Sequence, residues 1–374
     1  MDQYNFGVIY MYNYCFDYDK CRDIFLDFED DLKEYYSSVE KRCFTVKDNC
    51  FIDSFLCENE NNNKILMITT GEHGIEGYAG NVFLQIFIKE YLPILKYNGI
   101  SVNLVHAINP WGMKHKRRVN ENNVDLNRNF ILERNDLENS SFLEMKKYFT
   151  KRRPARKSDL NLIKSFLELV PYMTKLGNKG ITEALAKGQF VEDKSVYYGG
   201  QKDEKSTKYM KEIYDDIYNN YEFILHLDIH TGAGPKNKMS IVNSAFSNKE
   251  SSAWEKDFGY SPVVKTDKSS FYEIKGDMID YIYKKYKGKN YFYSTCFEYG
   301  TYGEGLIGSI KTIKSLVVEN QEWHYGSANS KTKEKVDQMF RGLFYPGDDS
   351  WKKSFEEDTR QGLNGVLKYF DFFK

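Results

Sequence analysis

The sequence predicts an α/β protein in which a mostly parallel sheet is covered by helices on both faces. Short apolar segments of strand length alternate along the chain with longer segments whose apolar residues recur at helical spacing. Several of the short segments are apolar at consecutive positions, which is typical of strands buried on both faces. No linker rich in Pro, Gly or Ser divides the 374 residues, so we expect a single domain over residues 1–374.

The first third of the chain predicts an alternating series of elements. The segment "DYDKCRDIFLDFEDDLKEYYS" has helical spacing, and "KILMIT" is a short run suited to a buried strand. "YAGNVFLQIFIKEYL", which follows that strand, reads as an amphipathic helix. In order, we expect a helix over 17–37, a strand over 50–57, a strand over 64–69, a helix over 78–92 and a strand over 100–109.

The rest of the chain predicts a helical stretch followed by further strands. Residues 139–220 read mostly as helix, interrupted by "GNKG", "KGQF" and "YYGGQ", and we expect a mainly helical insertion or cover there. Three buried strands are then predicted at "FILHLDI" (223–229), "MSIVN" (239–243) and "YFYSTCF" (291–297), with helices between them and at the C-terminus.

Composition excludes several classes of partner. The 53 basic and 54 acidic residues give a formal net charge of −1, so no global field favours nucleic acid or an acidic membrane. The basic stretches "KHKRR" and "KRRPARK" are read as solvated faces. No apolar run approaches the roughly 18 residues of a membrane span, and the N-terminus lacks the pattern of a secretory signal. We therefore expect a cytoplasmic protein without nucleic-acid or membrane partners, of unspecified oligomeric state.

The cysteines do not indicate a structural metal site. The sequence has six cysteines and no C-x-x-C pair among them. Without an export signal, free thiols are expected.

The segment "GEHGIEGYAG" (71–80) supplies the first candidate metal ligands. It places His73 and Glu76 three positions apart, directly after a predicted strand and at the entry to a predicted helix. Side chains at this spacing on such a turn can face the same way, as ligands of one ion must. The surrounding glycines are expected to leave room for an ion and a substrate close to the main chain.

Two more candidates stand at the ends of predicted strands. His230 ends "FILHLDI", and Glu298 ends "YFYSTCF". Functional groups of α/β sheets collect at the carboxyl ends of strands. Two imidazoles and one carboxylate are the ligand set of a catalytic zinc site with an open position for water. We therefore predict one Zn²⁺ ion held by His73, Glu76 and His230.

Two neighbours of His230 lie on the same face of the predicted strand, because strand side chains alternate. Asp228 is interpreted as a group that orients an imidazole ligand. His226 is interpreted as a core residue.

Together, these motifs resemble the zinc metallocarboxypeptidases of the M14 clan, and in particular the branch called DUF2817. The resemblance covers nearly the whole chain and rests on five motifs in order: "GEHGIEGYAG", "NPWGMKHKRRVNENNVDLNRNF" (109–130), "KGQF" with "YYGGQ", "LDIHTGAG" and "FEYGT". It implies a zinc-carboxypeptidase-like fold, a mixed eight-stranded sheet between helices with the metal at the strand ends.

The resemblance also implies roles for individual residues. The zinc ligands fall on His73, Glu76 and His230. Glu298 becomes the general base that activates the zinc-bound water. The other implied positions are Arg118, preferred over Arg117, for polarising the scissile carbonyl, and Asn127 with Arg128 for holding the substrate carboxylate. A tyrosine that closes over the substrate is not assigned, although Tyr272, Tyr281 and Tyr283 lie in the corresponding region.

The leading hypothesis is thus a zinc-dependent hydrolase that cleaves a peptide or peptide-like amide next to a free carboxylate. An alternative is an N-acyl amino acid amidohydrolase of the aspartoacylase and succinylglutamate desuccinylase type, which shares H-x-x-E and "DLNR"-like motifs. A third alternative is a catalytically silent binding module. Taken alone, "DLNRNF" fits an exposed turn in which Arg128 pairs with Asp125 as well as it fits a carboxylate-binding site.

Overall fold

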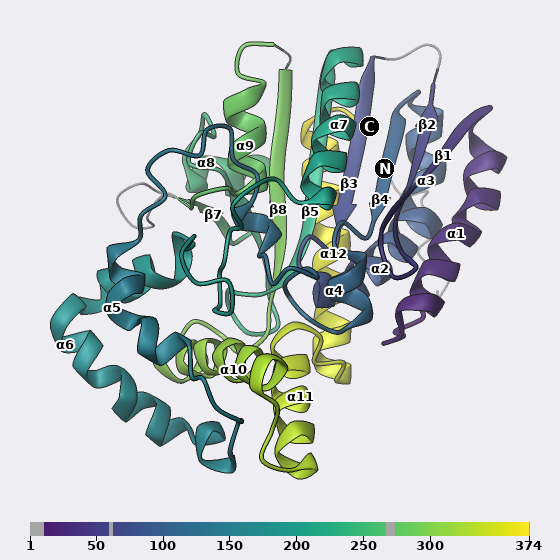
Figure 1. Ribbon diagram of the computed structural model, residues 1–374. Helices are drawn as coiled ribbons and strands as arrows, with labels where there is room; N and C mark the ends of the chain where they lie inside the picture. Colours follow the sequence, from purple (N-terminus) through teal and green to yellow (C-terminus); the bar gives the residue numbers. More distant parts are fainter. Residues whose placement is uncertain (1–10, 60–62, 267–273, 290, 374) are drawn as a thin grey trace.

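The computed structural model describes residues 11–59, 63–266, 274–289 and 291–373. In these residues a sheet of eight strands runs in the order β1-β2-β4-β3-β5-β8-β6-β7 (Figure 1). The strands are β1 (Ser38–Lys47), β2 (Cys50–Glu58), β3 (Lys64–Thr70), β4 (Ser101–His106), β5 (Phe223–Gly232), β6 (Met239–Asn243), β7 (Val263–Lys265) and β8 (Tyr291–Gly300).

The sheet is mixed and mostly parallel. The central strands β4, β3, β5 and β8 run parallel to one another, and β6 and β7 are also parallel. The antiparallel pairs are β1 with β2, β2 with β4, and β6 with β8. The α/β class predicted from the alternation of elements is therefore confirmed, and so is the mixed eight-stranded sheet implied by the resemblance.

Helices occupy much of the remaining described chain. The longer ones are α1 (Tyr18–Tyr35), α2 (Gly77–Ile86), α3 (Leu92–Tyr97), α4 (Pro110–Lys114), α5 (Ser140–Phe149), α6 (Leu162–Ala186), α7 (Lys205–Asn220), α8 (Ser251–Phe258), α9 (Met278–Lys285), α10 (Leu306–Tyr325), α11 (Ser330–Phe344) and α12 (Asp349–Tyr369). Short helical turns are η1 (Gly74–Glu76), η2 (Phe87–Tyr91), η3 (Leu126–Arg128) and η4 (Lys157–Leu160).

Alternation along the central strands gives the sheet an apolar layer on each face. In β3, Leu66 and Ile68 belong to the hydrophobic core that also contains side chains of α1, α2 and α12. Ile65 and Met67 belong to a second core with side chains of α7 and α9. Figure 1 shows helices on the two sides of the sheet accordingly. Two-sided burial explains why this strand is apolar at consecutive positions.

All the strands predicted from the sequence are present, but β1 and β7 were missed. β1 is an edge strand whose side chains are mostly exposed or half-buried, so it lacks the apolar run of a buried strand. β7 has only three residues. A strand this short carries too few positions for a periodic pattern.

The stretch 139–220 is largely helical, as predicted. α5 and α6 pack against each other, and α10 also contacts α6. α7 instead packs on the sheet through Met210, Ile213 and Tyr214. The segment between α6 and α7 has no regular helix and passes close to Arg128. A Cβ atom added to Gly188 or Gly199 would clash with Arg128, which shows how close the two segments lie.

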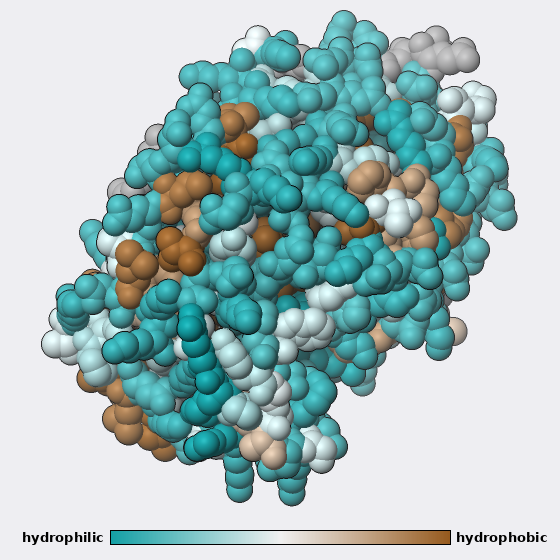
Figure 2. All heavy atoms as spheres, viewed as in Figure 1, coloured by the Kyte–Doolittle hydropathy of each residue, from teal (hydrophilic) through white to brown (hydrophobic). Residues whose placement is uncertain are grey.

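The visible surface is mainly hydrophilic (Figure 2). Apolar groups gather on it in small clusters, one of them over α6, where Ile163 and Leu167 are exposed. Among the described residues, no helix combines the length and apolarity needed to cross a membrane. The six cysteines are free, as predicted.

Candidate metal centre and active site

The predicted site residues lie where three adjacent strands end. β3 and β8 flank β5 in the sheet, and all three strands run parallel. His230 near the end of β5 pairs in register with Glu298 of β8. The chain leaving β3 at Thr70 enters the turn that carries His73 and Glu76. Parallel strands thus bring residues from distant parts of the sequence to one edge of the sheet.

The turn after β3 is held by main-chain hydrogen bonds. Residues Gly74–Glu76 form the helical turn η1, which leads directly into α2. The N–H groups of Gly74 and Ile75 donate to the carbonyl oxygens of Arg118 and Arg117, at 3.1 and 2.9 Å. These bonds fix the segment that carries the two arginines beside the segment that carries the predicted ligands.

The glycines of the turn serve a different purpose from the one predicted. A Cβ atom on Gly74 would lie 2.2 Å from the carbonyl carbon of Gly112, and one on Gly77 would lie 2.8 Å from the sulfur of Met113. Gly71 has φ +68°, and its Cβ would lie 2.7 Å from that of Ala107. The expectation that the glycines make room for an ion and substrate is therefore wrong. They allow the turn to pack against the segment that follows β4.

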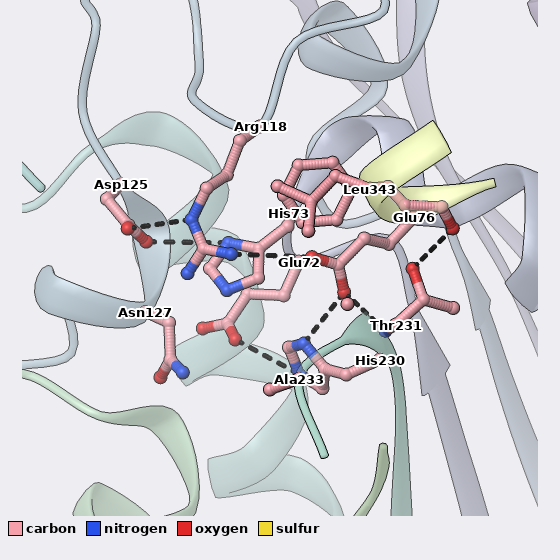
Figure 3. A network of polar contacts seen from close by, with 12 residues as sticks. Glu72, His73, Glu76, Arg118, Asp125, Asn127, His230, Thr231, Ala233 and Leu343 are labelled. Carbon is pink, nitrogen blue, oxygen red and sulfur yellow. Dashed lines mark hydrogen bonds and ion pairs between the residues drawn. The ribbon is translucent and has the colours of Figure 1, made fainter. Parts of the chain in front are cut away.

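His73 and Glu76 both lie beside His230, although the donor atoms within 4.8 Å of one another are those of Glu72, His73 and His230, without Glu76. The rings of His73 and His230 lie 5.1 Å apart between centroids, with an interplanar angle of 70°. Glu76 Oε2 lies 3.1 Å from Nδ1 of His230 and accepts a hydrogen bond of 2.8 Å from the Thr231 N–H. All three predicted ligands are buried. Figure 3 shows Glu76 and His230 turned toward each other, with His73 beside them.

Glu72 also lies in this cluster and was missed by the sequence reasoning. Its Oε2 is 3.5 Å from Nε2 of His230. Donor atoms of Glu72, His73 and His230 all lie within 4.8 Å of one another. The available signal was its place next to His73 in "GEHG", where a carboxylate stands among small residues at the end of a buried strand.

A chain of hydrogen bonds between buried polar side chains holds His230 in place. Asp228 hydrogen-bonds to Nε2 of His230, and its other oxygen accepts a 2.6 Å bond from the Thr69 hydroxyl. The same hydroxyl lies 2.9 Å from Nε2 of His226, whose Nδ1 lies 2.8 Å from the Ser294 hydroxyl. The structure therefore places Asp228 in the orienting position predicted for it, and His226 is buried in the core.

Electrostatics distinguishes the two imidazoles. Burial, helped by the charge of Arg118, holds the pKa of His73 well below its ordinary value, so this imidazole is neutral. Burial also lowers the pKa of His230, but Asp228, Cys296 and Glu76 together outweigh it and leave that pKa well above the ordinary value. The surroundings of His230 therefore favour a positive charge, either on the imidazole or next to it.

Arg118, and not Arg117, faces the site. The Nε of Arg118 donates to Asp125 at 3.1 Å, and its Nη1 lies 3.4 Å from Glu76 Oε1. Asp125 Oδ1 also lies 3.4 Å from His73 Nδ1, without the geometry of a hydrogen bond. Arg117 points away and pairs with Glu319 at 2.7 Å, beneath the ring of Trp323.

Glu298 lies next to the ligands without joining the chain of hydrogen bonds beneath them. Its Oε1 accepts a 2.8 Å bond from the Ala233 N–H. Burial, followed by the negative charge of Glu76, raises the pKa of its carboxyl to about 7. Donor atoms of Glu298, Cys296 and His230 lie within 4.8 Å of one another. A carboxyl with a pKa near neutrality can accept and return a proton.

Arg128 is buried and has no ion pair among the described residues. Burial raises the pKa of the nearby Asp277 carboxyl, and the charge of Arg128 partly offsets this rise. Its Nη1 donates to the main-chain oxygen of Asn127 at 2.6 Å, and its Nε has no hydrogen bond in this part of the chain. The reading in which Arg128 pairs with Asp125 is excluded, because that carboxylate pairs with Arg118. The side chain of Asn127 accepts a 2.9 Å bond from the Met278 N–H, so its oxygen is already engaged at the start of α9.

Tyr197, from the segment between α6 and α7, lies between the two arginines. Its ring centroid is 5.8 Å from Cζ of Arg118 and 5.6 Å from Cζ of Arg128. The sequence reasoning assigned it no role, although it stands in "YYGGQ". Of the tyrosines considered there, Tyr281 and Tyr283 pack on Phe130 and Phe292, and Tyr272 falls outside the described residues.

The residues fit a divalent cation. Both oxygens of Glu72 and Nδ1 of His73 are buried without a hydrogen-bond partner among the described residues. Unpaired buried polar atoms are costly, and a cation would satisfy them. Carboxylates outnumber fixed cations around the site: Glu72, Glu76, Asp125, Asp228 and Glu298 surround it, against Arg118 and Arg128.

Comparison with known proteins identifies one matching family. The profile of the family described as "Protein of unknown function (DUF2817)" matches residues 14–357. No curated protein sequence matches the chain.

Solved structures give distant matches. Bovine thrombin-activatable fibrinolysis inhibitor is 16% identical, with coverage of 83% of this chain and 96% of that chain and a TM-score of 0.46. Carboxypeptidase A from Helicoverpa armigera is 14% identical, with coverage of 88% and 74% and a TM-score of 0.45. An aspartoacylase family protein from Mesorhizobium loti is 14% identical, with coverage of 79% and 69% and a TM-score of 0.38.

Proposed function

The chain belongs to the DUF2817 family, and we propose that it is a zinc-dependent hydrolase that cleaves a peptide or peptide-like amide next to a free carboxylate. One observation supports this above the others: His73 and Glu76 both lie beside His230 at the ends of adjacent strands, and Glu298 also lies next to His230. That arrangement combines a ligand set for one Zn²⁺ ion with a separate carboxyl suited to proton transfer.

The ligands would hold the ion, which when bound supplies a Lewis acid for the scissile carbonyl and for the attacking water. The hydrogen bond between Asp228 and Nε2 of His230 leaves Nδ1 of that ring facing Glu76, so that an ion bound between them would take both as ligands. The neutral imidazole of His73 can donate a lone pair in the same way.

Glu298 is the proposed general base and then acid. Its pKa of about 7 allows the carboxyl to take a proton from the attacking water and pass it to the departing nitrogen near neutral pH. The N–H of Ala233 holds one carboxyl oxygen in place.

Arg118 and Arg128 are given different tasks. Arg118, held by Asp125 and Glu76, is positioned to stabilise negative charge on the carbonyl oxygen. Arg128 is buried without an ion pair among the described residues, so its guanidinium is available for a substrate carboxylate. Asn127 is proposed to contribute to the same subsite through its amide N–H₂ group, since its oxygen is engaged by Met278.

The experiment is an assay of the zinc-loaded protein against N-blocked dipeptides and N-acyl amino acids, each with a free and with an amidated carboxyl group. We expect release of the C-terminal residue from the free dipeptides, and loss of that activity in Glu298→Gln with zinc content unchanged. Turnover of N-acyl amino acids alone would favour the deacylase alternative. An activity that persists in Glu298→Gln would not come from this site, and no activity on any substrate would favour a binding module.

A further inference from the structure

Glu72 is a buried acid that has no hydrogen-bond partner among the described residues. Only 1% of the residue is exposed, and both carboxyl oxygens lack a hydrogen bond within the described ranges. The carboxylate belongs to the segment that carries His73, but it has no role in the proposed proton transfer or substrate binding. Its position therefore needs a separate explanation.

The carboxylate faces the candidate metal centre. Oε2 lies 3.5 Å from Nε2 of His230, and the donor atoms of Glu72, His73 and His230 lie within 4.8 Å of one another. Figure 3 shows Glu72 and Glu76 approaching His230 from different directions. Glu72 therefore lies close to both imidazoles that are predicted as ligands, on the Nε2 side of His230, whereas Glu76 faces Nδ1 of that ring.

No fixed cation of the described residues neutralises Glu72. Arg118 is engaged by Glu76 and Asp125, and Arg117 is engaged by Glu319. His230 lies 3.5 Å from Glu72, but its imidazole also pairs with the carboxylates of Asp228 and Glu76. Burying a carboxylate that accepts no hydrogen bond costs free energy, which a bound cation would offset.

A protonated carboxyl group does not remove the difficulty. Its hydroxyl would also need an acceptor, and neither oxygen of Glu72 has a hydrogen-bond partner in the described part of the chain. A purely structural role is also hard to support, because the one ion-pair contact of the carboxyl group among the described residues is with His230, itself a predicted ligand. A metal ion satisfies both oxygens at once.

We propose that Glu72 is a fourth protein ligand of the metal centre formed by His73, Glu76 and His230, an inference that rests on the proposed metal centre but not on any particular substrate. The ion would then have two imidazoles and two carboxylates as protein donors. A second carboxylate increases the affinity of the site for divalent cations. It also shifts the preference of the site toward ions that accept several oxygen ligands, such as Mn²⁺.

The test compares the full-length protein with Glu72→Gln, a variant of the same size without the negative charge. Zinc affinity is measured by competition with a chromophoric chelator, and Mn²⁺ affinity by calorimetry. Removal of a partner outside the ligand set weakens metal binding by roughly 10- to 100-fold, so loss of a direct ligand should weaken it at least tenfold. We expect the loss for Mn²⁺ to exceed the loss for Zn²⁺.

Thermal stability supplies a second measurement that separates a ligand from a structural residue. In metal-free protein, Glu72→Gln should melt at the same or a higher temperature than the wild type, because it removes a buried unpaired charge. In saturating zinc the order should reverse, because ten times weaker binding removes about 1.4 kcal/mol of the stabilisation that the metal supplies. A structural residue would lower the melting temperature in both conditions.

Glu192→Gln is the matched control. Glu192 is also buried, but it pairs with Lys146 and Arg152 and is not among the site residues. This variant should lose stability with or without zinc and keep its metal affinity.

If Glu72→Gln binds zinc as tightly as the wild type while His230→Ala does not, Glu72 is no ligand and the proposed function still stands. If the wild type itself binds no divalent ion, both proposals fall.

Discussion

Asp228 hydrogen-bonds to Nε2 of His230 and thereby leaves Nδ1 of that imidazole facing Glu76, 3.1 Å away. Asp228 and His230 are two positions apart in β5, so their side chains lie on the same face of the strand. The strand itself therefore places the carboxylate beside the imidazole. The carboxylate is in turn held by Thr69 on the neighbouring strand β3. The orientation of a candidate ligand is thus built into the sheet, before any loop contributes.

The variant Asp228→Asn should weaken zinc binding. The amide keeps the size of the carboxylate but removes the charge that increases the basicity of His230, and changes of this kind cost roughly 10- to 100-fold in metal affinity. Chelator competition measures the effect. Asp159→Asn, a buried acid that pairs with Arg153, is the control and should leave the affinity unchanged. Equal affinities of Asp228→Asn and wild type would remove Asp228 from the metal centre.

Arg118→Lys should lower kcat by about 100-fold with a small change in KM. Lysine keeps the positive charge beside Glu76 and Asp125 but loses the fork of donors that reaches the carbonyl oxygen. Steady-state kinetics on an N-blocked dipeptide measures it. A normal kcat would show that another group stabilises the oxyanion.

Arg117→Met is expected to act through stability instead. Its guanidinium is buried and pairs with Glu319, and removing one partner of a buried pair costs about 3 kcal/mol. Denaturant unfolding should report this loss, while kcat of the folded fraction stays near the wild-type value. A fall in kcat comparable with that of Arg118→Lys would mean that the two arginines are not distinguished by the site.

Arg128→Gln should reduce kcat/KM for substrates with a free carboxylate by about 100-fold. The variant loses the charge-assisted hydrogen bonds between the buried guanidinium and the substrate carboxylate. Substrates amidated at the same position serve as the internal control, and their slow turnover should not change. If both substrate types lose activity to the same degree, Arg128 does not select the carboxylate.

Lys314 gives a pH-dependent prediction far from the site chemistry. The residue is only 1% exposed, its Nζ has no hydrogen-bond partner among the described residues, and burial lowers its pKa to about 8. The unfolded chain keeps the ordinary lysine pKa of about 10.4. Between these values the unfolded state binds more protons, so this residue's penalty is complete below pH 8 and disappears as the pH rises toward 10.4.

Lys314→Met should therefore melt at a higher temperature than the wild type at pH 7, with a difference that narrows steadily above pH 8. Thermal denaturation of both proteins across this range measures it. A difference that is constant with pH would mean that Lys314 finds a counter-charge in solution.

The sequence predicted the central strands because two-sided burial leaves a direct pattern. β3, β5 and β8 are apolar at consecutive positions, and each ends in a polar residue or motif that the sheet then brings together. The positions of His73, His230 and Glu298 at strand ends could be predicted because the end of each strand follows from local signals, whereas the order of the strands in the sheet was not predicted. β1 and β7 left no such pattern, since one is a polar edge and the other is too short.

The direction of loop side chains had to wait for the tertiary structure. Arg117 and Arg118 are adjacent and chemically identical. Only the packing of their segment on η1 and α10 turns the first toward Glu319 and the second toward Glu76. The same holds for Tyr197, which a long connection places between two arginines.

What the sequence determined by itself is therefore the layered α/β sheet, the identity of its buried strands and the candidate ligands at their ends, because burial and alternation act over a few neighbouring residues. Only the tertiary structure decided the role of the glycines near His73, the inward turn of Arg118 and the placement of Glu72 against His230. Those outcomes depend on contacts between segments far apart in the chain, and no local pattern records such contacts.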